Sequence, residues 1–304
     1  ETPEIADVVF VIREFAKVEV KRVTFLGNEF LPDEEIKNIM ATREGDWGSF
    51  LTSFGEFKEE AFGQDLQRIT AYYYDKGFVQ VKVQRPVLRL SRDKRYLFIT
   101  IAIEEGPQFS VGEVKVSGDY IVDEDQMMKM VKLEEDGVFS AGTMRQDMEK
   151  MRNLHMDAGY AYVNVNPLTA IHEAERKVDI TYDVQKGRQV YFGRIELVGN
   201  TKTRDKVIRR ELRIEEGQLF SNTRLEASKA RVSRLGFFEK VDITTQRSDR
   251  DDVINARVEI VERPTGTFQV GAGFSSLESF ILNAQISQNN LFGRGQSLSF
   301  QAQV

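Results

Sequence analysis

The sequence predicts an α+β protein in which tandem βααββ modules are followed by the first antiparallel strands of a transmembrane β-barrel. Two observations lead to this fold class. Gly-Asn or Gly-Asp steps at Gly27, Gly118 and Gly199 lie 91 and 81 residues apart and mark one module each. Beyond residue 263 the charges almost vanish, and apolar residues alternate with polar ones.

Composition excludes several classes of protein. The 304 residues contain 42 Lys and Arg against 48 Asp and Glu, whereas a general nucleic-acid binder needs a basic excess. The chain has no cysteine, which excludes disulfide scaffolds, zinc ribbons and thiol nucleophiles. No apolar run reaches the roughly 20 residues of a membrane-spanning helix. We expect no catalytic residue, no metal site and no cofactor.

Each module is predicted to open with a strand and a helix. An apolar pair four and two residues before the glycine, such as Val23 and Phe25, indicates a half-buried strand. Apolar residues nine and thirteen positions after the glycine predict one buried helical stripe. These pairs are Ile36 and Met40, Met127 and Val131, and Ile208 and Leu212.

A second glycine, always followed by an aromatic residue, predicts the end of a second helix in each module. We expect a left-handed glycine cap, with the ring packed back onto the core. These steps are Gly77-Phe78, Gly159-Tyr160 and Gly236-Phe237. Two strands should follow each step, over 79–90 and 96–103, 162–171 and 178–184, and 240–246 and 253–261.

Prolines identify the strand at the edge of each sheet. Pro86 and Pro167 interrupt the second strand of their modules, and proline cannot donate to a ladder. The third strand should then be central, between the first and the second. The edge strand is predicted to accept an unfolded client by strand addition, or else to be a plain edge shielded by charge. Its residues are Val79, Gln80, Val81, Lys82 and Val83.

The modules are predicted to abut without linkers. Thirteen residues separate Glu14 from Gly27, and the same interval precedes the other two glycines. Because the same interval recurs at the N-terminus, we expect the last strand of a truncated preceding module at 1–17. The three complete modules are predicted at 18–108, 109–189 and 190–263, and a truncated barrel at 264–304.

Residues 264–304 are predicted to be three membrane strands. They carry two charges, Glu278 and Arg294, whereas the preceding 263 residues hold the other 88. A soluble hairpin pair is the alternative, but its outer face would normally carry Lys and Glu. Three strands cannot close a barrel, so a larger membrane domain is expected. The apolar face comprises Phe268, Val270, Ala272, Phe274, Phe280, Leu282, Ala284, Ile286, Leu298, Phe300, Ala302 and Val304.

The chain resembles the POTRA region and first barrel strands of the outer-membrane protein assembly factors. The stretches that carry the resemblance are 199–217 with Ile208-Arg209-Arg210-Glu211-Leu212, 234–239, 261–266 and 290–295. The resemblance implies the third, fourth and fifth POTRA modules, with residues 1–263 in the periplasm and the barrel in the outer membrane of a Gram-negative cell. It implies unfolded outer-membrane proteins, accessory lipoproteins of the assembly complex and outer-membrane lipid as partners, without nucleic acid.

The resemblance also implies sites for these partners. Arg209, Arg210 and Glu211 lie on the outer side of a predicted helix, where the family docks accessory proteins; a solvated charged face is the alternative. The resemblance assigns no role to the loop that contains Trp47 and Phe50. From the residue types alone, Trp47 and Phe50, with Leu51 and Phe54, are predicted to form an exposed patch for a partner or lipid headgroups, or else to cover the helices of their own module.

A weak barrel seam is predicted at Phe268, Val270, Gly271 and Gly273, because glycine packs nothing and costs backbone entropy. Such a strand would ease lateral opening toward the membrane; close packing or a bend in the barrel wall is the alternative. The two histidines, His155 and His172, are expected to be solvated bystanders.

The predicted function is that of a periplasmic part of an outer-membrane β-barrel assembly factor, which receives unfolded outer-membrane proteins and promotes their folding and insertion. A two-partner secretion or translocation-assembly barrel transporter is the near alternative, although such transporters typically carry two modules. A periplasmic enzyme with accessory repeats would need a convergent set of catalytic groups, which the sequence lacks.

Overall fold

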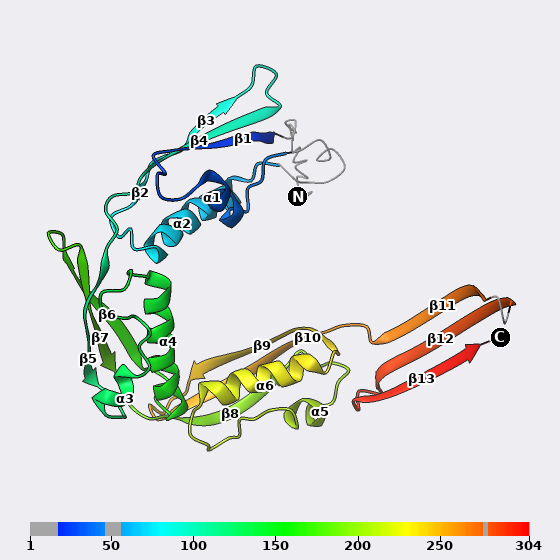
Figure 1. The fold of residues 1–304 in the computed structure, drawn as a ribbon. Helices are drawn as coiled ribbons and strands as arrows, with labels where there is room; N and C mark the ends of the chain where they lie inside the picture. Colours follow the sequence, from blue (N-terminus) through cyan, green and yellow to red (C-terminus); the bar gives the residue numbers. More distant parts are fainter. Residues whose placement is uncertain (1–17, 46–55, 276–278, 304) are drawn as a thin grey trace, which may run out of the picture. The chain divides into compact units, whose positions relative to one another are not determined.

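The computed structural model describes residues 18–45, 56–275 and 279–303 (Figure 1). The predicted strand of a preceding module at 1–17 lies outside these residues. Contacts group the chain into two compact units, and the middle module contributes to both. In each module the helices cover one face of a small sheet (Figure 1).

The first module has its last strand at the centre of the sheet. Its elements are β1 (Glu19–Leu26), α1 (Asp33–Ile39), α2 (Glu59–Asp75), β2 (Lys82–Val83), β3 (Val87–Leu90) and β4 (Tyr96–Glu104). β4 pairs in parallel with β1 and antiparallel with β2 and β3. The core lies between the sheet and α2, where Ile69, Tyr73, Ile99 and Ile101 are at most 1% exposed.

The other two modules repeat this plan. The middle one comprises β5 (Ser110–Asp119), α3 (Glu124–Met128), α4 (Ala141–Asp157), β6 (Asn164–His172) and β7 (Lys177–Gln185). The last one comprises β8 (Tyr191–Val198), α5 (Asp205–Arg209), α6 (Asn222–Arg234), β9 (Phe238–Arg247) and β10 (Val253–Glu262). The sheet orders β5-β7-β6 and β8-β10-β9 confirm the central third strand and the edge position of the second.

The glycine that follows the first strand is required in each module by a close backbone approach. Gly27, Gly118 and Gly199 have φ of 80°, 97° and 92°. A Cβ on them would lie 2.3, 2.2 and 2.0 Å from a carbonyl oxygen of the central strand. The predicted glycine caps are also confirmed, because Gly77 and Gly159 have φ of 86° and 95°.

The first helices are shorter than the apolar spacing predicts. α3 ends at Met128 and α5 at Arg209, before the second residue of each predicted pair. Val131 and Leu212 are therefore only half-buried, and Leu133 and Ile214 fill the core instead. The prediction of a two-residue helical stripe is wrong in these modules, because the chain leaves the helix within five residues.

The predicted continuous edge strand over 79–90 is also wrong. Only Lys82 and Val83 pair with the central strand, and the ladder resumes at Val87 after Pro86. Val81 is 6% exposed and belongs to the core. Val79 lies in a turn ahead of the ladder, and the side-chain amide of Gln80 donates to Glu173 at 2.8 Å.

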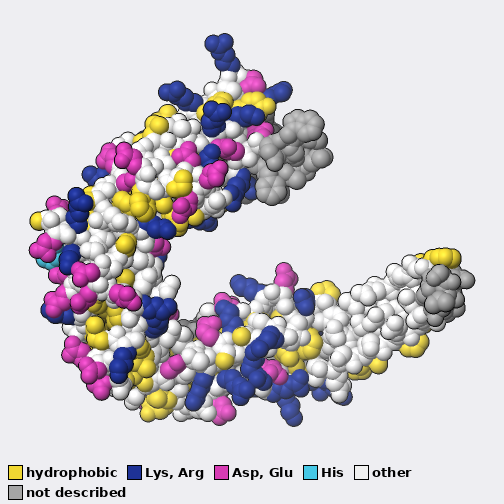
Figure 2. Space-filling view, in the orientation of Figure 1, with side chains coloured by type: hydrophobic (Ala, Val, Ile, Leu, Met, Phe, Trp, Pro, Cys, Tyr) yellow, Lys and Arg dark blue, Asp and Glu magenta, His cyan; other side chains and the backbone are white. Residues whose placement is uncertain are grey.

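The last three strands form an open antiparallel sheet, β11 (Gly266–Ser275), β12 (Ser279–Leu291) and β13 (Gln296–Gln303). Phe268, Ile286 and Phe300 share one row, and the next row consists of glutamines. The predicted alternation is thus confirmed, with Phe268 71% and Phe300 68% exposed. Figure 2 shows charged side chains over the modules and very few over this sheet. Across the described ranges, no helix is long and apolar enough to cross a membrane.

Candidate functional site

The predicted partner-binding residues fall in three places. Trp47 and Phe50 lie outside the residues that the structure describes. Lys82 and Val83 form the short edge strand β2. The charged run at the end of α5 is largely paired within its own module, because Arg209 donates to the carbonyl of Ile195 at 3.0 Å and Glu211 accepts from Arg231 at 2.8 Å.

Each module uses one buried polar side chain of its second helix to hold the end of the first helix. Asp65 is fully buried and accepts from the backbone N–H groups of Ala41 and Thr42 at 2.7 and 2.8 Å. Asp147 accepts in the same way from residues 132 and 133, at 2.8 and 3.1 Å. In the last module the acceptor is Ser228, which is 2.7 Å from the N–H of Arg213. Helical periodicity alone cannot distinguish these polar residues from exposed ones.

A second set of hydrogen bonds connects each module to the next one. Asp75 accepts from the N–H of Gly142 at 2.5 Å. Asp157 accepts from the hydroxyl of Ser221 at 2.8 Å and from the N–H of Thr223 at 2.9 Å. Burial raises the pKa of Asp157, but these hydrogen bonds outweigh it and leave the pKa below its ordinary value.

One of the two histidines, His155, is not the solvated bystander that the sequence predicts, whereas His172 is exposed as expected. His155 is fully buried; its Nδ1 lies 2.6 Å from the carbonyl of Met151, and its Nε2 lies 3.4 Å from the N–H of Ile121. His172 contacts the carboxylate of Asp179 at 2.8 Å on the surface. His155 lies four residues after the fully buried Met151 on the same helix, so it shares the buried face of α4.

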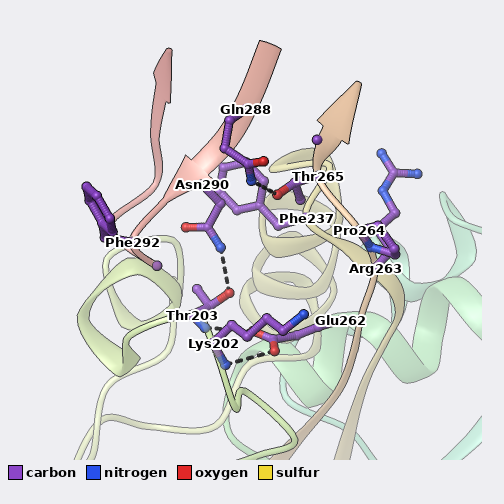
Figure 3. Close-up of a pocket in the computed structure, with 12 residues that line it drawn as sticks. Lys202, Thr203, Phe237, Glu262, Arg263, Pro264, Thr265, Gln288, Asn290 and Phe292 are labelled. Carbon is purple, nitrogen blue, oxygen red and sulfur yellow. Dashed lines mark hydrogen bonds between the residues drawn. The ribbon is translucent and has the colours of Figure 1, made fainter. Parts of the chain in front are cut away.

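A cavity of about 480 Å³ lies between the last module and the sheet of β11 to β13 (Figure 3). Below it, the carboxylate of Glu262 accepts from the N–H groups of Lys202 and Thr203 at 2.9 and 2.7 Å. Burial raises the pKa of Glu262, but the hydrogen bonds around it prevail, so the pKa lies below its ordinary value. The cavity is lined by Lys202, Thr203, Phe237, Glu262, Arg263, Pro264, Thr265, Gly266, Gln288, Asn290, Phe292 and Gly293.

The turn between β12 and β13 closes the other side of this cavity. Asn290, Phe292, Gly293 and Gly295 all have positive φ, between 52° and 71°. The side-chain amide of Asn290 donates to the hydroxyl of Thr203 at 2.8 Å, as Figure 3 shows. The site is therefore a joint between two parts of the chain, built from hydrogen bonds and close packing.

Neither a nucleophile with a base nor a metal cluster is found at this joint. In the parts of the chain that the structure describes, no group of three His, Asp or Glu side chains is placed to hold a metal ion. The hydrogen bonds of this joint hold backbone segments in position.

The family model for POTRA, described as a surface antigen variable number repeat, matches residues 18–106, 109–187 and 190–263. The chain belongs to the POTRA family. Each match corresponds to one module of the fold, so the POTRA resemblance seen in the sequence is confirmed.

Relatives of this POTRA chain are assembly factors. The outer membrane protein assembly factor BamA of Nitratidesulfovibrio vulgaris (strain Hildenborough) is 31% identical over 98% of this chain and 38% of the relative. BamA of Neisseria meningitidis serogroup B is 30% identical over 97% of this chain and 37% of the relative. The chain thus spans about two fifths of the length of these curated relatives.

Solved structures share the same modular fold. The crystal structure of Haemophilus influenzae BamA POTRA3-5 superposes with a TM-score of 0.70, at 23% identity, over 81% of this chain and 96% of that one. BamA of Haemophilus ducreyi lacking POTRA domains 1-3 gives a TM-score of 0.59, at 27% identity, over 64% of this chain and 37% of that one. The α+β fold of tandem POTRA modules is confirmed.

Proposed function

We propose that this chain is the periplasmic region and first strands of an outer-membrane β-barrel assembly factor. It receives unfolded outer-membrane proteins on its POTRA modules and promotes their folding and insertion through the barrel that its last three strands begin. Residues 1–263 lie in the periplasm, and the strands from residue 264 onward lie in the outer membrane.

One observation carries this proposal: three POTRA modules lead, without an intervening domain, into a sheet with one exposed apolar face. Phe268, Phe274 and Phe300 are 68 to 82% exposed on strands of 8 to 10 residues. A surface of this kind is costly in water and matches the lipid-facing side of a membrane strand. The relatives named as assembly factors at 30 to 31% identity support the same assignment.

Client recognition is proposed at the sheet edges of the modules. A strand at an edge offers free N–H and C=O groups, and pairing through the backbone ignores client sequence. In the first module the edge consists of β2 and β3. Leu88 and Leu90, both on β3, are about half exposed. Val79, Gln80 and Val81 lie outside the ladder, so Lys82, Val83 and β3 now carry the proposed client site.

The barrel seam is proposed at β11. This strand pairs with β12 on one side only, and a Cβ on Gly271 or Gly273 would meet nothing within 4 Å. Phe268 and Val270 on the same strand face the apolar side of the sheet. Few side-chain contacts hold such a strand to a neighbour, so it can exchange its partner for a client strand at low cost.

Accessory lipoproteins of the assembly complex are proposed to dock on the last module near Arg209 and Arg210, the two exposed members of the charged run. Trp47 and Phe50 remain a proposed contact for a partner or for lipid headgroups. Outer-membrane lipid contacts the apolar face of the sheet, and no nucleic-acid partner is proposed.

We propose a non-enzymatic role, in which pairing and insertion require no covalent step. A barrel transporter of the two-partner or translocation-assembly type is less well supported, because both relatives named above, which match nearly the whole of this chain, carry the assembly-factor name. The alternative of a periplasmic enzyme with accessory repeats has no support, because the described residues contain no convergent set of catalytic groups.

Reconstitution tests the proposed function. The full-length protein in phospholipid vesicles is given a urea-unfolded outer-membrane barrel protein, and folding is followed by the gel shift of the folded barrel. We expect folding to accelerate over protein-free vesicles and over vesicles that carry an unrelated barrel of similar size. Equal folding rates in all three would rule out the assembly-factor role and leave transport as the remaining barrel function.

A further inference from the structure

The loop of residues 201–204 holds the turn of residues 290–295. The N–H of Arg204 donates to the carbonyl of Gly293 at 3.0 Å, and the hydroxyl of Thr203 accepts from the amide of Asn290 at 2.8 Å. The last module and the sheet are thus joined twice, once by the chain at Pro264 and once by this contact (Figure 3).

The contact is a close approach of backbone to backbone. A Cβ on Gly293 would lie 1.9 Å from the carbonyl oxygen of Lys202, and the φ of Gly293 is 68°. A Cβ on Gly295 would lie 2.8 Å from the guanidinium of Arg210. Only glycine at position 293 lets the turn seat this deeply on the loop.

The loop is held in shape by contacts that do not involve the turn. Asn200 donates from its side-chain amide to the carbonyl of Thr203 at 3.0 Å and to Asp205 at 2.7 Å. The carboxylate of Glu262 accepts from the backbone on the other side of the loop. Because the loop is fixed in advance, the loop itself loses little conformational entropy when the turn docks.

The first module builds the same loop, and both sister modules carry different side chains at the contact position of Thr203. In the first module Asn28 repeats the bonds of Asn200, to the carbonyl of Leu31 at 2.9 Å and to Asp33 at 2.8 Å. The position of Thr203, four residues after the glycine, is occupied by Leu31 there and by Val122 in the middle module. Neither side chain has a hydroxyl to accept from a turn.

The other contact position differs in the same way. Arg204 donates its N–H to the turn, and the matching residue of the first module is Pro32, which has no N–H. Both groups that hold the turn are therefore absent from the first module. The first and last modules share the loop scaffold. The two groups that bind the turn are present together in the last module.

We propose that residues 201–204 form a socket for the turn of residues 290–295, and that this socket couples the last module to the first barrel hairpin. A movement of the module on client binding is then transmitted through the turn to β12 and to its partner β11, the proposed seam. The occupant of the socket is this chain's own turn. The coupling rests on the proposed function, whereas the docking itself does not.

Disulfide trapping tests the docking in the full-length protein. The 304 residues contain no cysteine, so no native thiol among them competes with an introduced pair. In a cysteine-free background, the pair Thr203→Cys with Asn290→Cys is expected to cross-link nearly completely under mild oxidation. The control pair, Thr244→Cys with Asn290→Cys, is expected to stay reduced. Absence of the first cross-link, or equal cross-linking of both pairs, would overturn the socket.

Spin-label distances between Glu239→Cys and Ser299→Cys test what holds the joint. Thr203→Val, which gives the last module an apolar residue as in its sisters, is expected to raise the undocked fraction roughly 2- to 12-fold, because one hydrogen bond is lost. Gly293→Ala is expected to abolish the docked population. Thr244→Val and Gly217→Ala are matched controls, since Gly217 also has positive φ but has no atom within 4 Å of a Cβ. An unchanged distance distribution in Thr203→Val and Gly293→Ala would overturn the proposal.

The same variants separate the coupling from the proposed function. If Gly293→Ala undocks the turn and slows assembly in vesicles, while Gly217→Ala does not, the coupling is supported. Undocking without any loss of assembly would overturn the coupling and leave the proposed function standing. If the unmodified protein assembles no client, the proposed function fails, and the distance measurement still decides whether the socket exists.

Discussion

Tyr73 and His155 occupy the same position in the first and middle modules, four residues before the glycine that ends the second helix. Both hold the loop that follows the first strand. The hydroxyl of Tyr73 donates to Glu105 at 2.8 Å, and Glu105 accepts from the N–H of Phe30 at 3.0 Å. In the middle module, Nε2 of His155 accepts directly from the N–H of Ile121. Two different side-chain sets thus satisfy one structural requirement.

The residue that replaces Glu105 explains the difference. In the middle module its position is occupied by Lys186, which cannot accept a hydrogen bond and pairs with Asp119 at 2.8 Å instead. The imidazole therefore has to supply the acceptor. Since Nδ1 faces a carbonyl, Nδ1 carries the proton and Nε2 is free to accept.

Replacing His155 by Phe is expected to loosen the middle module alone. The change keeps a ring but leaves the N–H of Ile121 without an acceptor, at a cost of about 1 to 3 kcal/mol. Amide hydrogen exchange at Ile121 measures this cost as a lower opening free energy. Tyr73→Phe is the control and should affect Phe30 but not Ile121. Equal protection of Ile121 in both variants would contradict the assigned role of His155.

Removing the buried carboxylate of the first module is expected to cost more than removing the buried hydroxyl of the last. Asp65→Ala strands two backbone N–H groups, for a loss of roughly 2 to 6 kcal/mol, whereas Ser228→Ala strands one, for about 1 to 3 kcal/mol. Hydrogen exchange of Ala41 and Thr42 against Arg213 gives the comparison. A larger loss of opening free energy in the Ser228 variant would show that the two side chains do not play the same role in holding the end of the first helix.

Alanine at the first glycine of the last module is expected to unfold that module. Gly199→Ala combines a left-handed backbone, about 1 to 2 kcal/mol, with an overlap against the carbonyl of Ile260 that adds roughly 1 to 3 kcal/mol. Gly217→Ala has the backbone term only, because the φ of Gly217 is 84° and its Cβ site is open. Thermal unfolding followed by the near-ultraviolet signal compares the two. Similar transitions would refute the close approach at Gly199.

Acid is expected to loosen the loop of residues 201–204. The pKa of Glu262 is lower in the folded protein than its ordinary value of 4.5, so its stabilisation is complete above that pH and is lost as the pH falls through the folded pKa. Amide chemical shifts of Lys202 and Thr203 should therefore move below about pH 4.5. In Glu262→Gln this step should disappear, with weaker protection already at neutral pH. A step that survives in the variant would assign it to another carboxylate.

The repeat and its glycines were predictable because they depend on local rules. A left-handed φ or a backbone approach permits only glycine, so Gly27, Gly118 and Gly199 mark the modules whatever the surrounding side chains are. The apolar face of β11 to β13 was predictable for a similar reason, since alternation with period two is a property of each strand by itself.

The joint at the last module was not predictable from local pattern. Thr203 and Asn290 lie 87 residues apart, and neither is apolar or charged. Pro86 correctly marked an edge, but the course of the chain before it depends on Val81 finding a place in the core. The role of His155 as an acceptor accompanies the replacement of a carboxylate by Lys186, which an alignment of the modules on one another reveals.

The most direct test of client reception is photo-crosslinking in living cells, from a probe at Lys82 on β2 and from a probe at Phe268 on β11 of the full-length protein. Phe98 is the control, because it is exposed on the central strand β4 and offers no free edge. We expect both edge positions to capture newly made outer-membrane proteins and Phe98 to capture none. If neither edge position captures a client while assembly proceeds normally, these strands do not receive clients and the proposed client sites are wrong.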